Sequence, residues 1–293
     1  MSKRIETKVS ITAQGTCLTR AVSYYEKDPN YKSDDYIAPM LVPSYLNLIA
    51  KTEFSRKILK KCFFKAPGNY EYLIARTKFI DTVFRNLGSN IEQVLIFGAG
   101  FDSRAIRFKD ELEKARVFEL DAQVTQQTKI NSIKKKNIKF PPNLNFISID
   151  FNKESLSQKL DEAGFVKNKN CLFLLEGLTM YLNEESINNT FNLVNEYSGK
   201  NSLVIFDYVA ASLARQEDRY DDPKIKKHYE FLAKVGEKPC FAIDGYIHDF
   251  LAKYKLDLTD ELDSSRLAKE YFNKEDLGLI AKKFRIATAI KKV

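Results

Sequence analysis

The chain has 293 residues, of which 44% are hydrophobic and 29% are charged, a composition that indicates a folded protein and excludes a disordered one. This length suits one large α/β domain or two small ones. The net charge of +8 permits an anionic partner, but the densest basic run, at 134–136, lacks the interleaved aromatic residues typical of nucleic-acid binding.

The first ninety residues are expected to be helical. Apolar residues recur at helical spacing, and breaks rich in Pro and Gly separate the segments. The predicted helical segments are 11–26, 43–65 and 69–87. We interpret 1–90 as a helical cap on the domain that follows.

The hydrophobic pattern changes after residue 90. Five short runs are mostly apolar and do not alternate strictly with polar residues, which is typical of strands buried on both faces of a parallel sheet. They are 93–97, 116–120, 145–149, 171–175 and 202–206, and helix-like segments lie between most of them, at 102–114, 122–135, 153–163 and 184–198. This alternation predicts a doubly wound α/β core over 91–208.

The remaining residues are less regular. An insertion at 209–245 carries a charged run at 217–223 and a helical stretch that ends near Lys234. Two further strands are expected at 253–260 and 284–292, with a helix near 273–283 between them, so that 246–293 completes a mostly parallel sheet of seven strands. We find no linker, so 1–293 is expected to form a single domain.

Acidic residues follow four of the five core strands. These are Asp121, Asp150, Glu176 and Asp207, whereas Gly98 follows the first strand. Ligands of open α/β sheets bind beyond the carboxyl ends of the strands, so these residues are expected around one crevice. The alternative for each acid is that it caps the next helix.

The turn Gly98-Ala99-Gly100 is typical of a nucleotide-cofactor site, because small residues let the backbone approach a ligand. Asp121 follows at the spacing of a carboxylate that binds ribose hydroxyls. Ser103 stands where a dinucleotide site has its third glycine, which disfavours NAD. Spacing alone favours a methyl-donor cofactor but leaves a dinucleotide open.

Five segments in the same order resemble the leucine carboxyl methyltransferase family, specifically the bacterial-type O-methyltransferase branch of the class I enzymes. They are ARTKFID (75–81), QVLIFGAGFDSRAIRF (93–108), VFELD (117–121), FISIDF (146–151) and LLEGLTMYL (174–182). The resemblance implies a Rossmann-like fold with S-adenosyl-L-methionine as cofactor. The cofactor-binding residues it implies are Arg76, Gly98, Ala99, Gly100, Asp121, Asp150, Phe151 and Glu176.

The resemblance also implies a role for most of these residues. Arg76 would pair with the methionine carboxylate of the cofactor, for which a guanidinium is suited, and Glu176 would lie by its amino group. Gly98 would line the methionine moiety with its backbone. Without the resemblance, Arg76 would be interpreted as a surface salt bridge on a helix.

At the other end of the cofactor, Asp121 would bind the ribose hydroxyls. Asp150 and Phe151 would hold the adenine. Two residues depart mildly from the family pattern, since Ser103 replaces a threonine and Phe151 a leucine. Tyr181, within the last segment, is interpreted as a packing residue.

The methyl acceptor is constrained by the scarcity of histidine. Only His228 and His248 are present, and a carboxylate needs no general base. We therefore expect O-methylation of a carboxylate or acidic hydroxyl, on a small molecule or a protein C-terminus, and assign no catalytic residue. An RNA-modifying methyltransferase is the alternative, and an NAD-dependent oxidoreductase a weaker one. The acceptor pocket is expected between the N-terminal helices and the insertion at 209–245.

The cysteines and the lengths of the apolar runs bear on where in the cell the protein is expected. The four cysteines form no CxxC pair, so we expect neither a metal site nor a disulfide framework. No apolar run has the length that crosses a bilayer, and residues 1–10 lack a signal-peptide core. A cytoplasmic protein without a membrane partner is the expectation.

Overall fold

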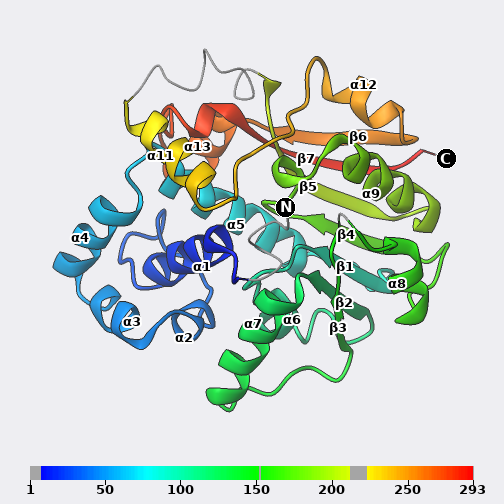
Figure 1. Ribbon diagram of the computed structural model, residues 1–293, viewed down its shortest axis with the longest axis horizontal. Helices are drawn as coiled ribbons and strands as arrows, with labels where there is room; N and C mark the ends of the chain where they lie inside the picture. The colour runs from blue at the N-terminus through cyan, green and yellow to red at the C-terminus, as the bar shows by residue number, and fades with distance from the viewer. Residues whose placement is uncertain (1–7, 152, 212–222, 293) are drawn as a thin grey trace.

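A seven-stranded sheet organises the chain in the computed structural model, which describes residues 8–151, 153–211 and 223–292 (Figure 1). The strand order is β3-β2-β1-β4-β5-β7-β6. The strands are β1 (Gln93–Phe97), β2 (Arg116–Asp121), β3 (Leu144–Ser148), β4 (Cys171–Leu175), β5 (Leu203–Val209), β6 (Leu256–Leu262) and β7 (Phe284–Lys291). Strands β1 to β5 pair in parallel, and β7 runs antiparallel to both β5 and β6. The predicted fold class is confirmed.

Helices cover both faces of this sheet. The N-terminal helices are α1 (Ile11–Tyr24), α2 (Ala38–Leu41), α3 (Ser44–Ala50), α4 (Glu53–Phe63) and α5 (Asn69–Arg85). The later helices are α6 (Arg104–Arg107), α7 (Gln123–Lys135), α8 (Leu156–Glu162), α9 (Glu184–Tyr197), α11 (Pro223–Lys234), α12 (Ile247–Ala252) and α13 (Ser264–Phe272). Residues 217–222 of the predicted charged run lie outside the described residues.

The core has two layers, one on each side of the sheet. Val94 and Ile96 of β1 pack with residues of α1, α5, α7 and α13. Their neighbours Leu95 and Phe97 point to the opposite face and pack with residues of α8, α9 and α12. Burial on both faces explains why successive residues of β1 are apolar rather than alternating with polar ones.

Two predicted helices are wrong. The one at 102–114 shrinks to α6, because the side-chain amide of Asn143 binds the carbonyls of Leu112 and Ala115 at 2.7 Å each and holds that segment in turns. The one near 273–283 lies earlier in the chain, as α13. The Asp263 side chain caps the start of α13, and Asn273, in the left-handed conformation, ends it.

Three other predicted boundaries shift. The segment 43–65 divides into α3 and α4, because the Thr52 side chain accepts a hydrogen bond from the Ser55 amide and starts a new helix. The strand expected at 253–260 is β6, which ends at Leu262. Strand β5 runs past the predicted 202–206 to Val209, so Asp207 lies within the strand rather than after it.

A buried ion pair fixes α7 to the sheet. The Lys129 ammonium lies 2.5 Å from a Glu119 carboxylate oxygen of β2, and both side chains are 2% exposed. Neither group can turn to water, so each depends on the other for its hydrogen bonds.

We predict that Lys129→Met lowers the free energy of unfolding by about 3–5 kcal/mol, because it leaves the Glu119 carboxylate buried and unpaired. Chemical denaturation measures this loss. The double variant Lys129→Met, Glu119→Leu removes both charges and should regain most of the stability. Equal stability of the wild type and the single variant would contradict the account.

Candidate functional site

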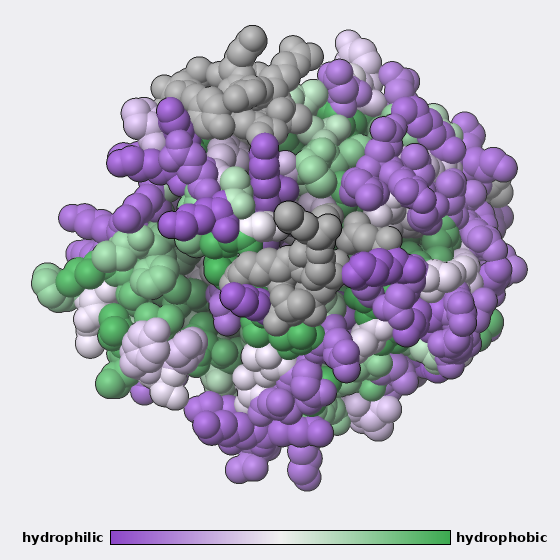
Figure 2. Space-filling model, viewed as in Figure 1, coloured by the Kyte–Doolittle hydropathy of each residue, from purple (hydrophilic) through white to green (hydrophobic). Residues whose placement is uncertain are grey.

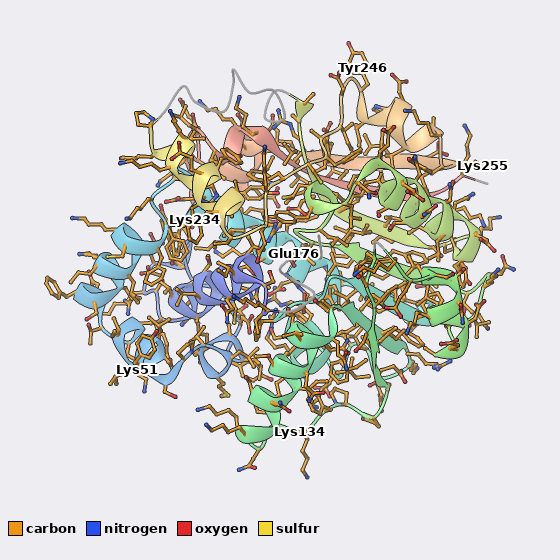
Figure 3. All side chains as sticks on the ribbon, in the orientation of Figure 1. Lys51, Lys134, Glu176, Lys234, Tyr246 and Lys255 are labelled. Carbon is orange, nitrogen blue, oxygen red and sulfur yellow. The ribbon has the colours of Figure 1, made fainter. Side chains whose placement is uncertain are left out.

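The carboxyl ends of β1, β2 and β4 open into a cavity of about 2260 Å³. Its walls include the start of α1, the segment from α2 to α4, and α11. All eight predicted cofactor-binding residues line it, although they come from distant parts of the sequence: Arg76, Gly98, Ala99, Gly100, Asp121, Asp150, Phe151 and Glu176. Glu176 lies near the middle of the molecule in Figure 3, whereas Lys51, Lys134 and Lys255 lie at its edge.

The glycine turn is shaped for close approach. Gly98 and Gly100 have φ values of +60° and +52°, in the region that favours glycine. A Cβ on Gly98 would lie 3.0 Å from Leu178, and one on Gly100 would lie 3.1 Å from the Cβ of Ala13. The turn therefore has no room for side chains, and its backbone faces the cavity directly.

Asp121 ends β2 beside this turn. One carboxylate oxygen accepts a hydrogen bond from the Gly100 amide, and the other accepts one from the Ala122 amide at 2.7 Å. Burial raises the pKa of Asp121 to about 6, although the two amide donors act in the opposite direction. Each oxygen keeps lone pairs for further donors, as a carboxylate that binds a diol requires.

Asp150 and Phe151 follow β3 at the rim of the cavity. The Asp150 carboxylate lies 3.0 Å from the Lys153 ammonium, and its backbone amide donates to Glu154 at 2.8 Å. Phe151 is partly buried and, like Leu178, packs against the core layer that contains Leu95 and Phe97. An acceptor group beside an apolar ring is the kind of slot that suits a planar base.

Arg76 is buried rather than at the surface. Its guanidinium lies 3.0 Å from the Glu176 carboxylate and 2.5 Å from that of Asp207. The Tyr72 hydroxyl donates to Asp207 at 3.1 Å, and the Gly177 amide donates to the same carboxylate at 2.6 Å. The interpretation of Arg76 as a surface salt bridge is wrong, because α5 turns this residue inward against the ends of β4 and β5.

Glu176 is held between two guanidiniums. Its second oxygen lies 2.5 Å from the Arg104 guanidinium of α6, which also lies 2.7 Å from Asp81 of α5. Burial alone would raise the pKa of Glu176, but Arg104 and Arg76 lower it below its usual value. The carboxylate is therefore ionised and fixed in position.

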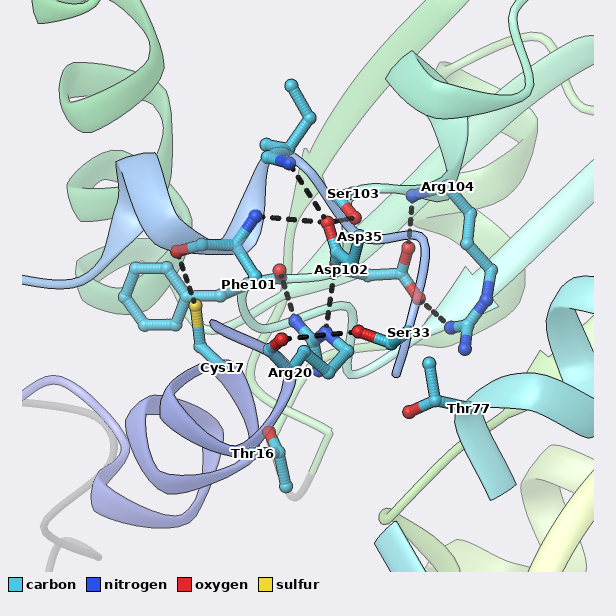
Figure 4. Close-up of polar contacts among 12 residues, drawn as sticks. Thr16, Cys17, Arg20, Ser33, Asp35, Thr77, Phe101, Asp102, Ser103 and Arg104 are labelled. Atoms are coloured by element: carbon cyan, nitrogen blue, oxygen red, sulfur yellow. Dashed lines mark hydrogen bonds and ion pairs between the residues drawn. The ribbon is translucent and has the colours of Figure 1, made fainter. Parts of the chain in front are cut away.

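The ion pairs continue to α1 (Figure 4). Arg107 bridges Asp81, at 2.8 Å, and Asp35, at 3.4 Å. Asp35 pairs with Arg20 at 2.8 Å, and the Arg20 guanidinium also donates to the Phe101 carbonyl beside the glycine turn. The ion-pair network thus ties α1 and α5 to the turn that follows β1.

Sequence reasoning missed most of this network. Asp81, Arg104 and Arg107 lie within the segments that resemble the family, and this position is the one feature of the sequence that could have indicated their role. The segment around Asp35 resembles no motif, so nothing in the sequence indicated that Asp35 joins the network. The network has one unsatisfied donor, since Nη2 of Arg104 is buried without a hydrogen-bond partner in the described structure.

The described residues, which leave out 1–7, 152, 212–222 and 293, contain no group of three or more His, Cys, Asp or Glu side chains that could hold a metal ion. They also contain no helix that is both long and apolar enough to cross a membrane.

The donor set fits a nucleoside cofactor with an amino-acid tail. The site offers a carboxylate with spare lone pairs, a turn without side chains, an apolar slot, and a guanidinium beside a carboxylate. Such a set, at the carboxyl edge of a doubly wound sheet, fits the class I S-adenosyl-L-methionine-dependent methyltransferases that the sequence resemblance predicts.

Comparison with known sequences specifies the family. The family model described as leucine carboxyl methyltransferase matches residues 13–195, and this chain belongs to that family. YktD of Bacillus subtilis (strain 168), provisionally named an S-adenosyl-L-methionine-dependent methyltransferase, is 29% identical over 60% of this chain and 58% of its own. A protein of Mycolicibacterium smegmatis with a similar name is 25% identical over 78% of this chain and 75% of its own. The chain thus matches little more than half the length of the Bacillus protein.

Solved structures agree on the fold. A protein of Thermobifida fusca YX, provisionally titled a methyltransferase, aligns with a TM-score of 0.59 over 98% of this chain and 96% of its own, at 14% identity. A DUF574 family protein of Streptomyces avermitilis aligns with a TM-score of 0.55 over 93% and 96%, at 11% identity. The predicted family is confirmed by the family model, and the two relatives are named for S-adenosyl-L-methionine, which is the predicted cofactor. The role of each site residue stays a prediction.

We predict that the affinity for S-adenosyl-L-methionine falls as the pH drops through about 6. The folded protein then protonates Asp121, and a neutral carboxyl group is a poorer acceptor for the ribose hydroxyls. Below that pH the affinity should fall by roughly tenfold per unit, as expected for binding that requires one ionised group. Calorimetric titration between pH 5 and pH 8 measures the slope.

Asp121→Ala should abolish cofactor binding at every pH. The matched control is Asp110→Ala, which removes an exposed carboxylate outside the cavity. Unchanged affinity in Asp121→Ala, or an equal pH slope in that variant and the wild type, would refute the placement of the ribose.

Proposed function

We propose that this protein is an S-adenosyl-L-methionine-dependent O-methyltransferase that methylates a carboxylate or an acidic hydroxyl, on a small molecule or a protein C-terminus. The part of the cavity lined by residues of 40–73 and 223–240 is here called the acceptor half. The rest, around the glycine turn, is the donor half.

The charge of the acceptor half carries this proposal. Six lysines line it: Lys60, Lys61, Lys65, Lys224, Lys227 and Lys238. Among the described residues it contains one carboxylate, Glu237, which accepts from the backbone amides of Ile11 at 2.7 Å and Thr12 at 2.8 Å. An excess of cations around a concave site attracts an anionic acceptor.

Among the described residues, Glu176, Asp207, Tyr181 and His228 are each poorly suited to act as a general base. Glu176 and Asp207 are ion-paired with arginines, and burial raises the pKa of Tyr181, which keeps its hydroxyl protonated. Burial lowers the pKa of His228, whose side chain lines the acceptor half. An acceptor that is already ionised at neutral pH suits such a site, because no proton has to be removed from it.

In this proposal the donor half binds the cofactor through the predicted residues. Arg76 and Glu176 hold the methionine end, Asp121 the ribose, and Asp150 with Phe151 the adenine. The cofactor supplies an electrophilic methyl group on sulfur. The protein contributes by aligning the acceptor oxygen in line with that methyl group and by excluding water from both.

The direct test incubates the protein and a cell extract with isotopically labelled S-adenosyl-L-methionine and identifies the labelled product by mass spectrometry. A methyl ester that mild base hydrolyses supports the proposal. Label on a nitrogen atom or an aliphatic alcohol contradicts it. Label in RNA, with an affinity that falls steeply as salt rises, would instead support the RNA-modifying alternative.

For an ionised acceptor we predict that kcat is flat from about pH 6.5 to pH 8.5, because the acceptor is fully charged throughout this range. His228→Gln should then keep kcat within about threefold, since no step requires the imidazole as a base. A kcat that rises with pH and falls by a hundredfold or more in His228→Gln would indicate base catalysis on a hydroxyl acceptor.

A further inference from the structure

The lip of the acceptor half is apolar and exposed. Met40, Tyr45 and Phe63 line the cavity and yet remain 38%, 65% and 56% exposed. Phe231 of α11 lines the cavity from the insertion and is also exposed. Large side chains of this kind are usually buried, so an apolar rim at a cavity mouth marks a contact surface.

The apolar surface continues outward from this lip. On α3, Leu48 and Ile49 share a face with Tyr45, and on α4, Phe54 and Ile58 share a face one turn apart. Leu48 and Phe54 are 67% and 75% exposed. Figure 2 shows a hydrophobic surface on the side of the molecule that α3 and α4 form. We call Met40, Tyr45, Phe63, Leu48, Phe54 and Ile58 together the apolar lip.

Cations accompany the apolar lip. Lys61 and Lys65 line the cavity next to Phe63, and Lys224 and Lys227 approach it from α11. The cavity entrance therefore combines positive charge with an apolar track that leads from the acceptor half to the surface.

We propose that the acceptor is a long-chain aliphatic carboxylic acid, with its carboxylate in the acceptor half and its chain along the apolar lip. This inference rests on the proposed O-methylation of a carboxylate and names its substrate class. A small acid would leave the apolar lip uncovered, whereas a long chain covers it and gains binding free energy from each buried methylene.

The reaction balances in charge and atoms. A carboxylate oxygen of the acid forms the new C–O bond as the S–CH₃ bond breaks, and the bonding electron pair stays on sulfur. An anionic acid and a cationic sulfonium thus give a neutral methyl ester and a neutral thioether, with no proton transferred. The uncharged ester no longer interacts with the lysines of the acceptor half, which favours its release.

The test compares butyrate, octanoate and laurate as acceptors, each below its micelle concentration, with the labelled methyl donor. A buried methylene should increase kcat/KM by roughly fourfold, so laurate should exceed octanoate by at least about tenfold. The gain should appear in KM, because the added methylenes lie far from the reacting oxygen.

Phe63→Ser and Ile58→Ser should reduce the preference for laurate over octanoate by several-fold. Val166→Ser is the matched control, because Val166 is as exposed as Ile58, at 46% against 48%, but belongs neither to the apolar lip nor to the cavity lining. The control should keep the wild-type preference. Both substitutions in the apolar lip replace exposed side chains, and thermal unfolding checks that each variant is folded.

Three outcomes overturn the inference. Equal kcat/KM for all three acids leaves the carboxylate methyltransferase in place but removes the long-chain acceptor. Faster methylation of peptide C-termini than of laurate also removes the long-chain acceptor, and it identifies the apolar lip as a surface that contacts a protein substrate. No methylation of any acid by a protein that binds S-adenosyl-L-methionine refutes the proposed function itself, and the inference falls with it.

Discussion

The structure depends on one constraint: several charged side chains are buried beneath the glycine turn and must be paired. The side chains of Arg20, Arg76, Arg104 and Arg107 are at most 7% exposed, and each one pairs with a carboxylate from another element. An unpaired buried charge costs several kcal/mol, so the network forms only when α1, α5, α6 and the ends of β4 and β5 are all in place. The helical cap therefore has to pack against the sheet before the donor half can take its final structure.

This coupling explains how a helical cap can position the proposed cofactor site at the edge of the sheet. The network holds the Glu176 carboxylate and the Arg76 guanidinium fixed before any ligand arrives, so binding does not have to order them. Glu237 adds a second link, since it caps α1 from the far side of the acceptor half. Methyl transfer to an ionised acceptor needs little beyond such fixed positions and exclusion of water.

The sequence predicted the sheet well and the polar network poorly, for physical reasons. Strands β1 and β4 were placed correctly because burial on both faces leaves a continuous apolar run. The predictions of helices at 102–114 and 273–283 are wrong because the hydrophobic periodicity does not decide where these segments turn. Side-chain hydrogen bonds from Asn143 shape the first segment, and Asn273, in the left-handed conformation, ends the helix before the second. The eight proposed cofactor residues came from motifs, whereas pairings across sequence-distant residues, such as Asp207 with Arg76, require the fold.

The most direct test of this account is a crystal structure with S-adenosylhomocysteine bound. We predict the ribose hydroxyls within hydrogen-bond distance of Asp121, the adenine between Asp150 and Phe151, and the homocysteine end at Gly98, Arg76 and Glu176. The acceptor half should remain open beside the sulfur atom. A ligand bound with its ribose away from Asp121, or with its amino-acid end among the lysines of the acceptor half, would contradict the account.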